Sequence, residues 1–173
     1  MTPIVKTAIG LAIVLVAVFG VLLLMPASQP ATPAGAISGL GVTVNEGLAQ
    51  RGASLFSTKY GCSACHAVSS LGVSGSAAGP DLSRVLVAEV PAGTRPEANS
   101  VAKWYAEHGR ANPETKPDQA AELLSEFLEK PPAYSPVMQA QVQRLKGVAG
   151  GEEQWEKDVQ ALVEFLKKAA VGK

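Results

Sequence analysis

Two cysteines and a histidine constrain this chain more than any other feature. Cys62 and Cys65 are the only cysteines, and His66 follows the second one directly. Two cysteines are too few for a disulfide scaffold, so their use must be local. Thiols at this spacing can each form a thioether with a vinyl group of haem, and the adjacent imidazole can then bind the iron. The motif therefore predicts one covalently attached haem c.

Two other uses of these residues are weaker alternatives. A thioredoxin-like redox pair needs a preceding strand and a sheet, which the helical pattern of this chain does not supply. A zinc site would have to combine Cys62, Cys65 and His66 with His108, because the chain has no other cysteine or histidine. Adjacent residues such as Cys65 and His66 can hardly share one zinc tetrahedron. Haem is the favoured cofactor.

Residues 1–25 predict an N-terminal transmembrane helix. Between Ile4 and Met25 the only charge is Lys6, and the remainder is rich in Val, Leu and Ile. At about 1.5 Å per residue, such a run spans the roughly 30 Å hydrocarbon core of a bilayer. A cleaved signal peptide is the alternative, but its apolar run usually has only about 7 to 15 residues. We therefore expect a retained membrane anchor.

The charges around this segment predict its orientation. Lys6 precedes the helix and no basic residue follows until Arg51, so the positive-inside rule places the N-terminus in the cytoplasm. The chain would then be a single-pass protein of a bacterial inner membrane, with its remainder on the extracytoplasmic side. Residues 26–44 carry no charge and are rich in Pro, Gly and Ala, which is typical of a flexible linker. Residues 45–173 are expected to form one monohaem domain.

Helical spacing of apolar residues recurs through this domain, and no segment alternates for long with the period of a strand. The sequence thus predicts an all-α fold. Asn45 is an expected N-cap, and Ser135 is another because Pro136 suits the first helical position after it. Helices are expected over residues 46–58, 98–108, 119–129, from Ser135–Pro136 onward, and 152–169. Large loops are expected near residues 67–97 and 109–117.

Residues 45–170 resemble the class I cytochromes c. In that family an N-terminal helix with a Gly-x-x-x-Phe pattern crosses the C-terminal helix, and Gly52 and Phe56 match this pattern. The resemblance implies the class I cytochrome c fold, here with one N-terminal transmembrane helix. Haem attachment in this family takes place outside the cytoplasm in bacteria, which agrees with the topology predicted from Lys6.

A second motif of the family is a Gly-Pro-x-Leu turn, which residues 79–82 match. The resemblance implies that the carbonyl of Pro80 accepts the ring proton of His66, which would set the tautomer of the imidazole. It also implies that Leu82 packs on the haem edge.

The family usually completes the iron coordination with a methionine downstream, whose thioether raises the reduction potential. Met1 starts the chain and Met25 closes the apolar segment, which leaves Met138 as the available thioether. His108 is the rival ligand, although helix capping also explains a histidine at that position. An open iron is the third alternative. Gln139 follows Met138, where the family commonly has proline.

Three further residues are candidate donors to the haem propionates. Arg84, Trp104 and Tyr105 carry a guanidinium, an indole N–H and a phenol, all of which donate hydrogen bonds to carboxylates. Tyr60, just before the cysteines, is expected to pack on the haem.

An iron with six ligands has no vacant position for substrate, so these residues predict electron transfer. We find no catalytic constellation in the sequence and expect an electron carrier, not an enzyme. The 15 basic and 15 acidic residues cancel, which argues against a nucleic-acid partner and against long-range steering.

The expected partners are the membrane and other redox subunits, or cytochrome and copper-protein donors and acceptors. The chain resembles monohaem subunits of quinol-oxidising assemblies such as alternative complex III, or of haem–copper oxidases, which implies a resident subunit of a respiratory or photosynthetic complex. Alternatives are a freestanding tethered shuttle and a haem-based gas sensor. A dihaem peroxidase would need a second attachment motif, and the chain has one.

Overall fold

The computed structural model describes four ranges, residues 41–76, 78–86, 100–108 and 117–172. The predicted anchor and residues 26–40 of the predicted linker lie outside them. Among the helices in these four ranges, none has the length and apolar character needed to cross a bilayer.

The regular structure of the described ranges is helical, apart from one isolated β-bridge between Val68 and Val73. This confirms the all-α prediction for this part of the chain. Each predicted helix is present, and its ends differ by a few residues from the expected range. The elements are α2 (Glu46–Ser54), the π-helical turn η1 (Leu55–Lys59), the 3-10 turns η2 (Cys62–Ala64) and η3 (Ser69–Leu71), α3 (Ser100–Glu107), α4 (Pro117–Glu129), α5 (Pro136–Ala149) and α6 (Glu152–Val171).

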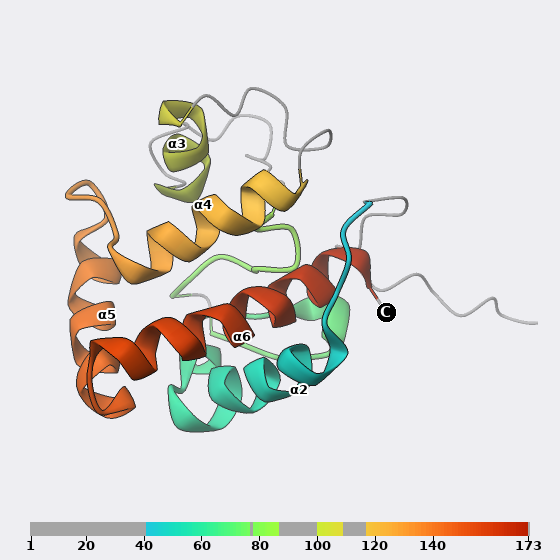
Figure 1. The fold of residues 1–173 in the computed structure, drawn as a ribbon, viewed down its shortest axis with the longest axis horizontal. Coiled ribbons are helices and arrows are strands. Elements are labelled where there is room, and N and C mark those ends of the chain that lie inside the picture. Colours follow the sequence, from blue (N-terminus) through green and yellow to red (C-terminus); the bar gives the residue numbers. More distant parts are fainter. Residues whose placement is uncertain (1–40, 77, 87–99, 109–116, 173) are drawn as a thin grey trace, which may run out of the picture. The chain divides into compact units, whose positions relative to one another are not determined.

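Helices α2 and α6 pack directly against each other (Figure 1). A Cβ atom added to Gly52 would lie 2.0 Å from the carbonyl oxygen of Ala161, so a larger residue here would force the helices apart. One turn later, the rings of Phe56 and Phe165 pack with their centroids 5.3 Å apart. The contact between these helices is thus built on the two residues that predicted it.

The two predicted N-caps behave differently. The side chain of Asn45 accepts a hydrogen bond from the N–H of Leu48 at 3.1 Å, and its own N–H donates to Glu164 at 2.6 Å. The Asn45 cap is therefore confirmed. Ser135 does occupy the cap position of α5, with Pro136 after it, but its side chain makes no capping hydrogen bond. The Ser135 prediction was right in position and wrong in mechanism.

Helix α2 ends in a wider turn than the sequence predicted. The N–H of Tyr60 donates to the carbonyl of Leu55 at 2.9 Å, five residues back, which makes η1 a π-helical turn. Such turns hold one more residue than an α-helical turn and often occur at functional sites. Here the turn leads directly into the segment with the two cysteines.

Figure 1 shows α6 between α2 and α4. At the start of α6, Trp155 is buried and its indole N–H donates to the carbonyl of Leu128 in α4 at 3.3 Å. The indole N–H of Trp104 joins α3 to α4 by donating to the carbonyl of Leu123 at 2.8 Å. These two bonds join α3, α4 and α6 to one another.

Candidate functional site

An apolar cavity of about 380 Å³ lies between the motif-bearing loops and the helices of the second half. His66 and Met138, the two candidate iron ligands, both line it. Three other predicted site residues, Cys62, Pro80 and Leu82, line it as well. The remaining lining residues are Phe56, Val85, Ser100, Val101, Leu124, Phe127, Leu128, Ser135, Leu162 and Leu166.

A tight turn presents the two cysteines. Gly61 has a φ of 62°, a left-handed conformation that suits glycine, and the 3-10 turn η2 follows it. Cys62 lines the cavity, whereas Cys65 is exposed and lies outside the cavity lining. Burial raises the pKa of the Cys62 thiol to about 11, so the free thiol is protonated at neutral pH.

The imidazole of His66 is held by a backbone carbonyl. Its Nδ1 lies 3.0 Å from the oxygen of Pro80, and a carbonyl can only accept, so Nδ1 carries the proton. This is the contact that the resemblance implied. The lone pair on Nε2 is then available to a metal.

A glycine allows this close approach. A Cβ atom on Gly79 would lie 2.6 Å from both Nδ1 and Cε1 of His66. Gly75, which the sequence did not single out, lies against the backbone of the same segment, because its Cβ atom would be 2.2 Å from the backbone nitrogen of Ala67. Both positions require glycine for steric reasons.

Met138 comes from a different part of the fold. It lies in the first turn of α5, two residues after Pro136. Ser135, at the start of this helix, is only 5% exposed and also lines the cavity. The thioether and the imidazole thus share one largely apolar space, although they are far apart in the sequence.

His108 lies elsewhere. It is exposed, its Nδ1 donates to the carbonyl of Trp104 at 2.8 Å, and its ring stacks on that indole with centroids 3.8 Å apart. It does not line the cavity. The hydrogen bond to a carbonyl in the last turn of α3 is the capping role that explained this histidine without iron.

Two expected propionate donors have other partners. The indole of Trp104 donates to Leu123, and the hydroxyl of Tyr105 donates to the carbonyl of Val85 at 3.2 Å. Both donors bond backbone carbonyls, which need a hydrogen-bond partner when they are buried. The sequence alone does not show which carbonyls lie near these side chains. Their roles toward a propionate stay predictions. Arg84 is exposed, and its role toward a propionate stays a prediction.

Tyr60 is also placed differently from the expectation. Its ring packs edge-on against Trp155 with centroids 5.2 Å apart, and it does not line the cavity. Its hydroxyl donates to Asp158 at 2.5 Å. Tyr60 therefore belongs to the packing between η1 and α6, not to the cavity wall.

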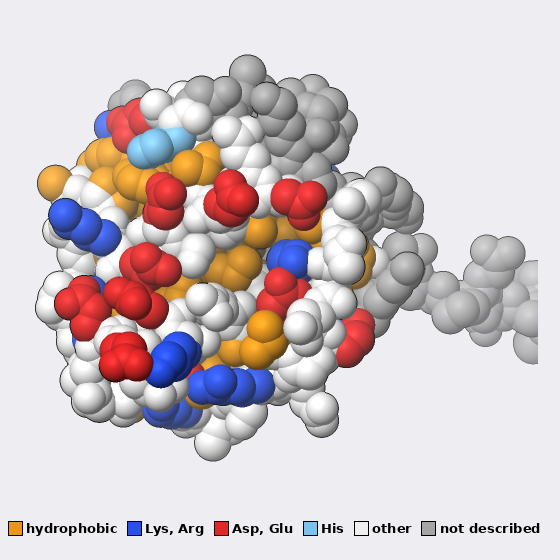
Figure 2. Space-filling model, viewed as in Figure 1, with side chains coloured by type: hydrophobic (Ala, Val, Ile, Leu, Met, Phe, Trp, Pro, Cys, Tyr) orange, Lys and Arg blue, Asp and Glu red, His pale blue; other side chains and the backbone are white. Residues whose placement is uncertain are grey.

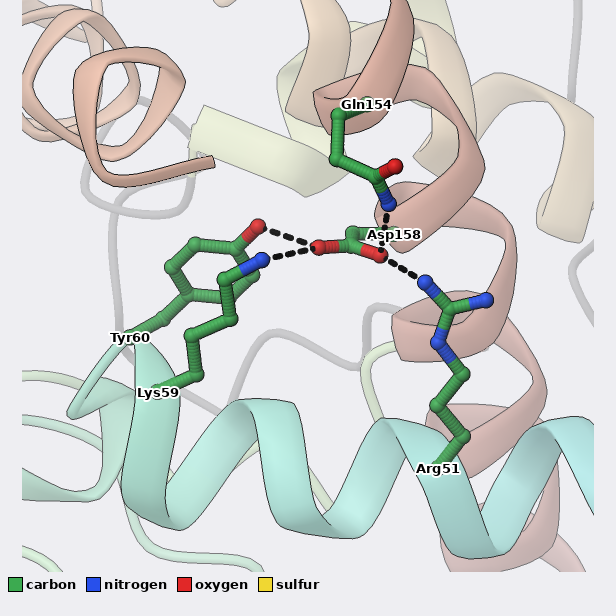
Figure 3. A network of polar contacts seen from close by, with 5 residues as sticks. All are labelled: Arg51, Lys59, Tyr60, Gln154 and Asp158. Atoms are coloured by element: carbon green, nitrogen blue, oxygen red, sulfur yellow. Dashed lines mark hydrogen bonds and ion pairs between the residues drawn. The ribbon is translucent and has the colours of Figure 1, made fainter. Parts of the chain in front are cut away.

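Asp158 gathers donors from two parts of the chain (Figure 3). Its side chain is 0% exposed and accepts hydrogen bonds from Lys59 at 2.8 Å, from Gln154 at 2.9 Å and from Arg51. Burial alone would raise its pKa, but the hydrogen bonds from Lys59, Tyr60 and Gln154 outweigh burial and hold the pKa below its usual range.

Sequence reasoning missed this network. The available signal was an aspartate within the apolar stripe of α6, three residues after Trp155 and four before Leu162. The network fixes Lys59 and Tyr60, which directly precede Gly61 and Cys62. It is therefore a structural support for the cysteine turn.

The site residues fit a haem iron better than zinc. No group of three or more His, Cys, Asp or Glu side chains suited to a metal occurs in the ranges that the structure describes. An imidazole with a free Nε2 and a thioether in an apolar cavity are instead a ligand set typical of c-type haem iron. The Cys62 thiol lies at the edge of the same cavity, where a thioether to haem would form.

Comparison with protein families agrees with this fit. A family model described as cytochrome c matches residues 49–170, which include the cysteine motif, the proline turn and Met138. Searches of curated proteins and of solved structures give no match. The chain therefore belongs to the cytochrome c family, whose members carry a covalently attached c-type haem and transfer electrons.

Proposed function

We propose that this chain is a membrane-anchored monohaem electron carrier in which His66 and Met138 bind the iron and Cys62 and Cys65 hold the haem. The ligand assignment rests on one observation, namely that His66 and Met138 line the same cavity. The cysteine turn opens onto the same cavity through Cys62.

The protein side chains set the properties of the site. Haem, when bound, supplies a reversible one-electron change at iron. The hydrogen bond from His66 to Pro80 fixes the ring and makes Nε2 a stronger donor. The Met138 thioether is a soft ligand that favours reduced iron. The apolar walls exclude water. This also favours reduced iron, because the site then carries less positive charge.

Protein ligands on both sides leave no open position for a small molecule, which distinguishes an electron carrier from a gas sensor. Carbon monoxide added to the reduced full-length protein tests this point. An unchanged absorption spectrum supports an iron with no position open to a small molecule. A rapid spectral shift at low carbon monoxide concentration would favour the sensor, because it requires an open or easily displaced ligand.

The membrane part of the proposal rests on the sequence. Residues 1–25 would anchor the chain in a bacterial inner membrane, and residues 26–44 would tether the haem domain on the extracytoplasmic side. Fractionation of cells, followed by protease treatment of intact spheroplasts, tests this topology. Cleavage of the haem domain from outside is the expected result.

We further propose that the chain is a resident subunit of a respiratory or photosynthetic complex, passing electrons from a quinol-oxidising unit toward a terminal acceptor. Acidic and basic side chains lie side by side on the face in Figure 2, a distribution that gives little long-range attraction to a mobile partner. A haem-stained native gel of mild-detergent extracts tests this. Migration with a large assembly supports the proposal, whereas migration alone indicates a tethered shuttle.

A further inference from the structure

A layer of hydrogen bonds lies behind the proline turn that contacts His66. One carboxylate oxygen of Asp81 accepts from the N–H of Ser83 at 2.8 Å and from its hydroxyl at 2.6 Å. The same oxygen lies 3.4 Å from the N–H of Ser69. Asp81 thus links its own turn to the segment that follows His66.

Ser83 carries the link into the interior. It is only 2% exposed, and its oxygen accepts from the N–H of Ser70 at 3.0 Å. The hydroxyl of Ser83 donates to Asp81, and its oxygen also lies 3.2 Å from the hydroxyl oxygen of Ser69.

The layer ends on helix α6. The hydroxyl of Ser70 donates to the carbonyl of Ala169, a fully buried residue, at 2.7 Å. The loop after His66 and the turn before Ser83 are thereby tied to the helix that packs on α2. These contacts hold the proline turn against a rigid element rather than against another loop.

The proline turn lacks one backbone hydrogen bond, at Pro80. Pro80 has no N–H, so the direction of its carbonyl depends on its neighbours. On one side the N–H of Gly79 donates to Cys65 at 3.0 Å, and on the other the N–H of Leu82 donates to Ala67 at 2.9 Å. Between Pro80 and Leu82, the side chain of Asp81 supplies the remaining restraint.

From this geometry we infer that Asp81 is a positioning residue, which acts through Ser69 and Ser83 to aim the Pro80 carbonyl at His66. The inference rests on the proposed role of His66 as iron ligand. A well-aimed carbonyl makes the imidazole a stronger donor, which stabilises oxidised iron. Asp81 therefore keeps the reduction potential lower than the same ligands would otherwise set.

The charge state of Asp81 suits this role. Burial would raise its pKa, but hydrogen bonds from Ser69 and Ser83 hold the pKa below its usual range. The side chain is thus an ionised acceptor at neutral pH.

The test compares Asp81→Ala with Asp81→Asn in the full-length holoprotein. Asparagine keeps an acceptor oxygen and loses only the charge, whereas alanine loses both. Glu156→Gln, at an exposed position of α6, is a control for loss of one surface charge. Reduction potentials report on iron stabilisation, and low-spin electron paramagnetic resonance g-values report on the orientation and donor strength of His66.

We expect Asp81→Ala to raise the potential more than Asp81→Asn and to shift the g-values, while the control leaves the g-values unchanged. Equal potentials and g-values for the Asp81→Ala and Asp81→Asn proteins would overturn the positioning role. If Asp81→Ala yields no holoprotein, Asp81→Glu replaces it, because glutamate keeps the charge but displaces the carboxylate. Wild-type values for Asp81→Glu would then overturn it.

The wild-type protein separates this inference from the function on which it rests. A low-spin spectrum with a sulfur-to-iron charge-transfer band supports ligation by His66 and Met138, whatever the Asp81 variants show. Its absence would overturn the ligand assignment and, with it, the role of Asp81.

Discussion

The two sides of the cavity are built in different ways. On the His66 side, the ligand, its carbonyl acceptor and most of the hydrogen bonds behind them come from residues 65–83, and one bond from Ser70 reaches α6. On the Met138 side, the ligand lies at the start of α5 and reaches the cavity because that helix packs on α6. A local network fixes one ligand, and tertiary packing delivers the other.

This difference implies different responses to substitution. Most contacts that hold His66 are made by its own segment of the chain. A substitution in this segment therefore disturbs the imidazole directly. Met138 has local support mainly from Gln139, whose side-chain amide donates to Pro131 at 3.0 Å. We expect substitutions near His66 to disrupt the site by steric conflict with the imidazole. On the other side of the cavity, we expect disruption only when the Met138 sulfur itself is removed.

Gly79→Ala should have the largest effect, because it breaks the local side. The added Cβ atom would overlap the His66 ring at 2.6 Å, and the carbonyl oxygen of Cys65 at 3.1 Å leaves little room for adjustment. We expect almost no holoprotein on a haem-stained gel. Gly147→Ala is the matched control, since its Cβ atom would meet nothing within 4 Å. Normal haem content in the Gly79→Ala protein would show that the imidazole is less confined than the geometry indicates.

Met138→Ala should have the next largest effect and tests the other side. We expect loss of the sulfur-to-iron charge-transfer band and a fall in potential on the order of 0.1 V, because axial ligands set haem potentials over a range of about 0.8 V. Absorption spectroscopy and redox titration measure both. His108→Ala is the control and should change neither. The reverse pattern would make His108 the ligand and contradict the assignment from the cavity.

Asp158→Asn should cost about 3 kcal/mol in the free energy of unfolding, since it removes a buried carboxylate that faces two cations. Urea unfolding at neutral pH measures the loss, with Glu156→Gln on the same helix as control. A loss no larger than that of the control would mean that solvent around the half-exposed Arg51 and Lys59 replaces the carboxylate.

The pH dependence of the same variant has a defined sign. The pKa of Asp158 is lower in the folded protein than in the unfolded chain, where it is about 3.9. Its contribution is therefore complete above about pH 4 and is lost as the pH falls through the folded-state pKa. Urea midpoints measured down to pH 3 should converge for the wild-type and Asp158→Asn proteins. A constant gap would show that Asp158 does not titrate in this window.

The smallest effects compare the two helix starts. Asn45→Ala should cost about 1 kcal/mol, because Asn45 makes a capping hydrogen bond. Ser135→Ala should cost less than about 0.5 kcal/mol, because Ser135 makes none. Chemical unfolding of both variants measures the difference. Equal costs would mean that the Ser135 hydroxyl stabilises α5 in another way.

The same contrast explains how much could be predicted. The cysteine motif and the Asn45 cap were predictable because they depend on neighbouring residues. The Pro80 turn and the glycine at the helix contact were predictable because they match short motifs of the family. Met138 was found by elimination among three methionines, and its place in the cavity is a tertiary result.

What could not be predicted depends on which partners the fold brings together. Trp104 and Tyr105 carry suitable donors, but the carbonyls of Leu123 and Val85 come closest to them. In the sequence, Asp158 only interrupts an apolar stripe. The structure shows that it pairs with Arg51 and Lys59. The donor groups of Trp104 and Tyr105 were recognised from the sequence, and Asp158 was not. In each case the choice of partner needed the three-dimensional arrangement.

The π-helical turn η1 makes the number of residues between Gly52 and Cys62 part of the site. A π-helical turn already holds one more residue than an α-helical turn, so an additional residue inserted there would rotate everything after it by about 100°. Lys59 would leave Asp158, and Cys62 would turn away from the cavity. Substitutions along this stretch can keep the site, but an added residue cannot.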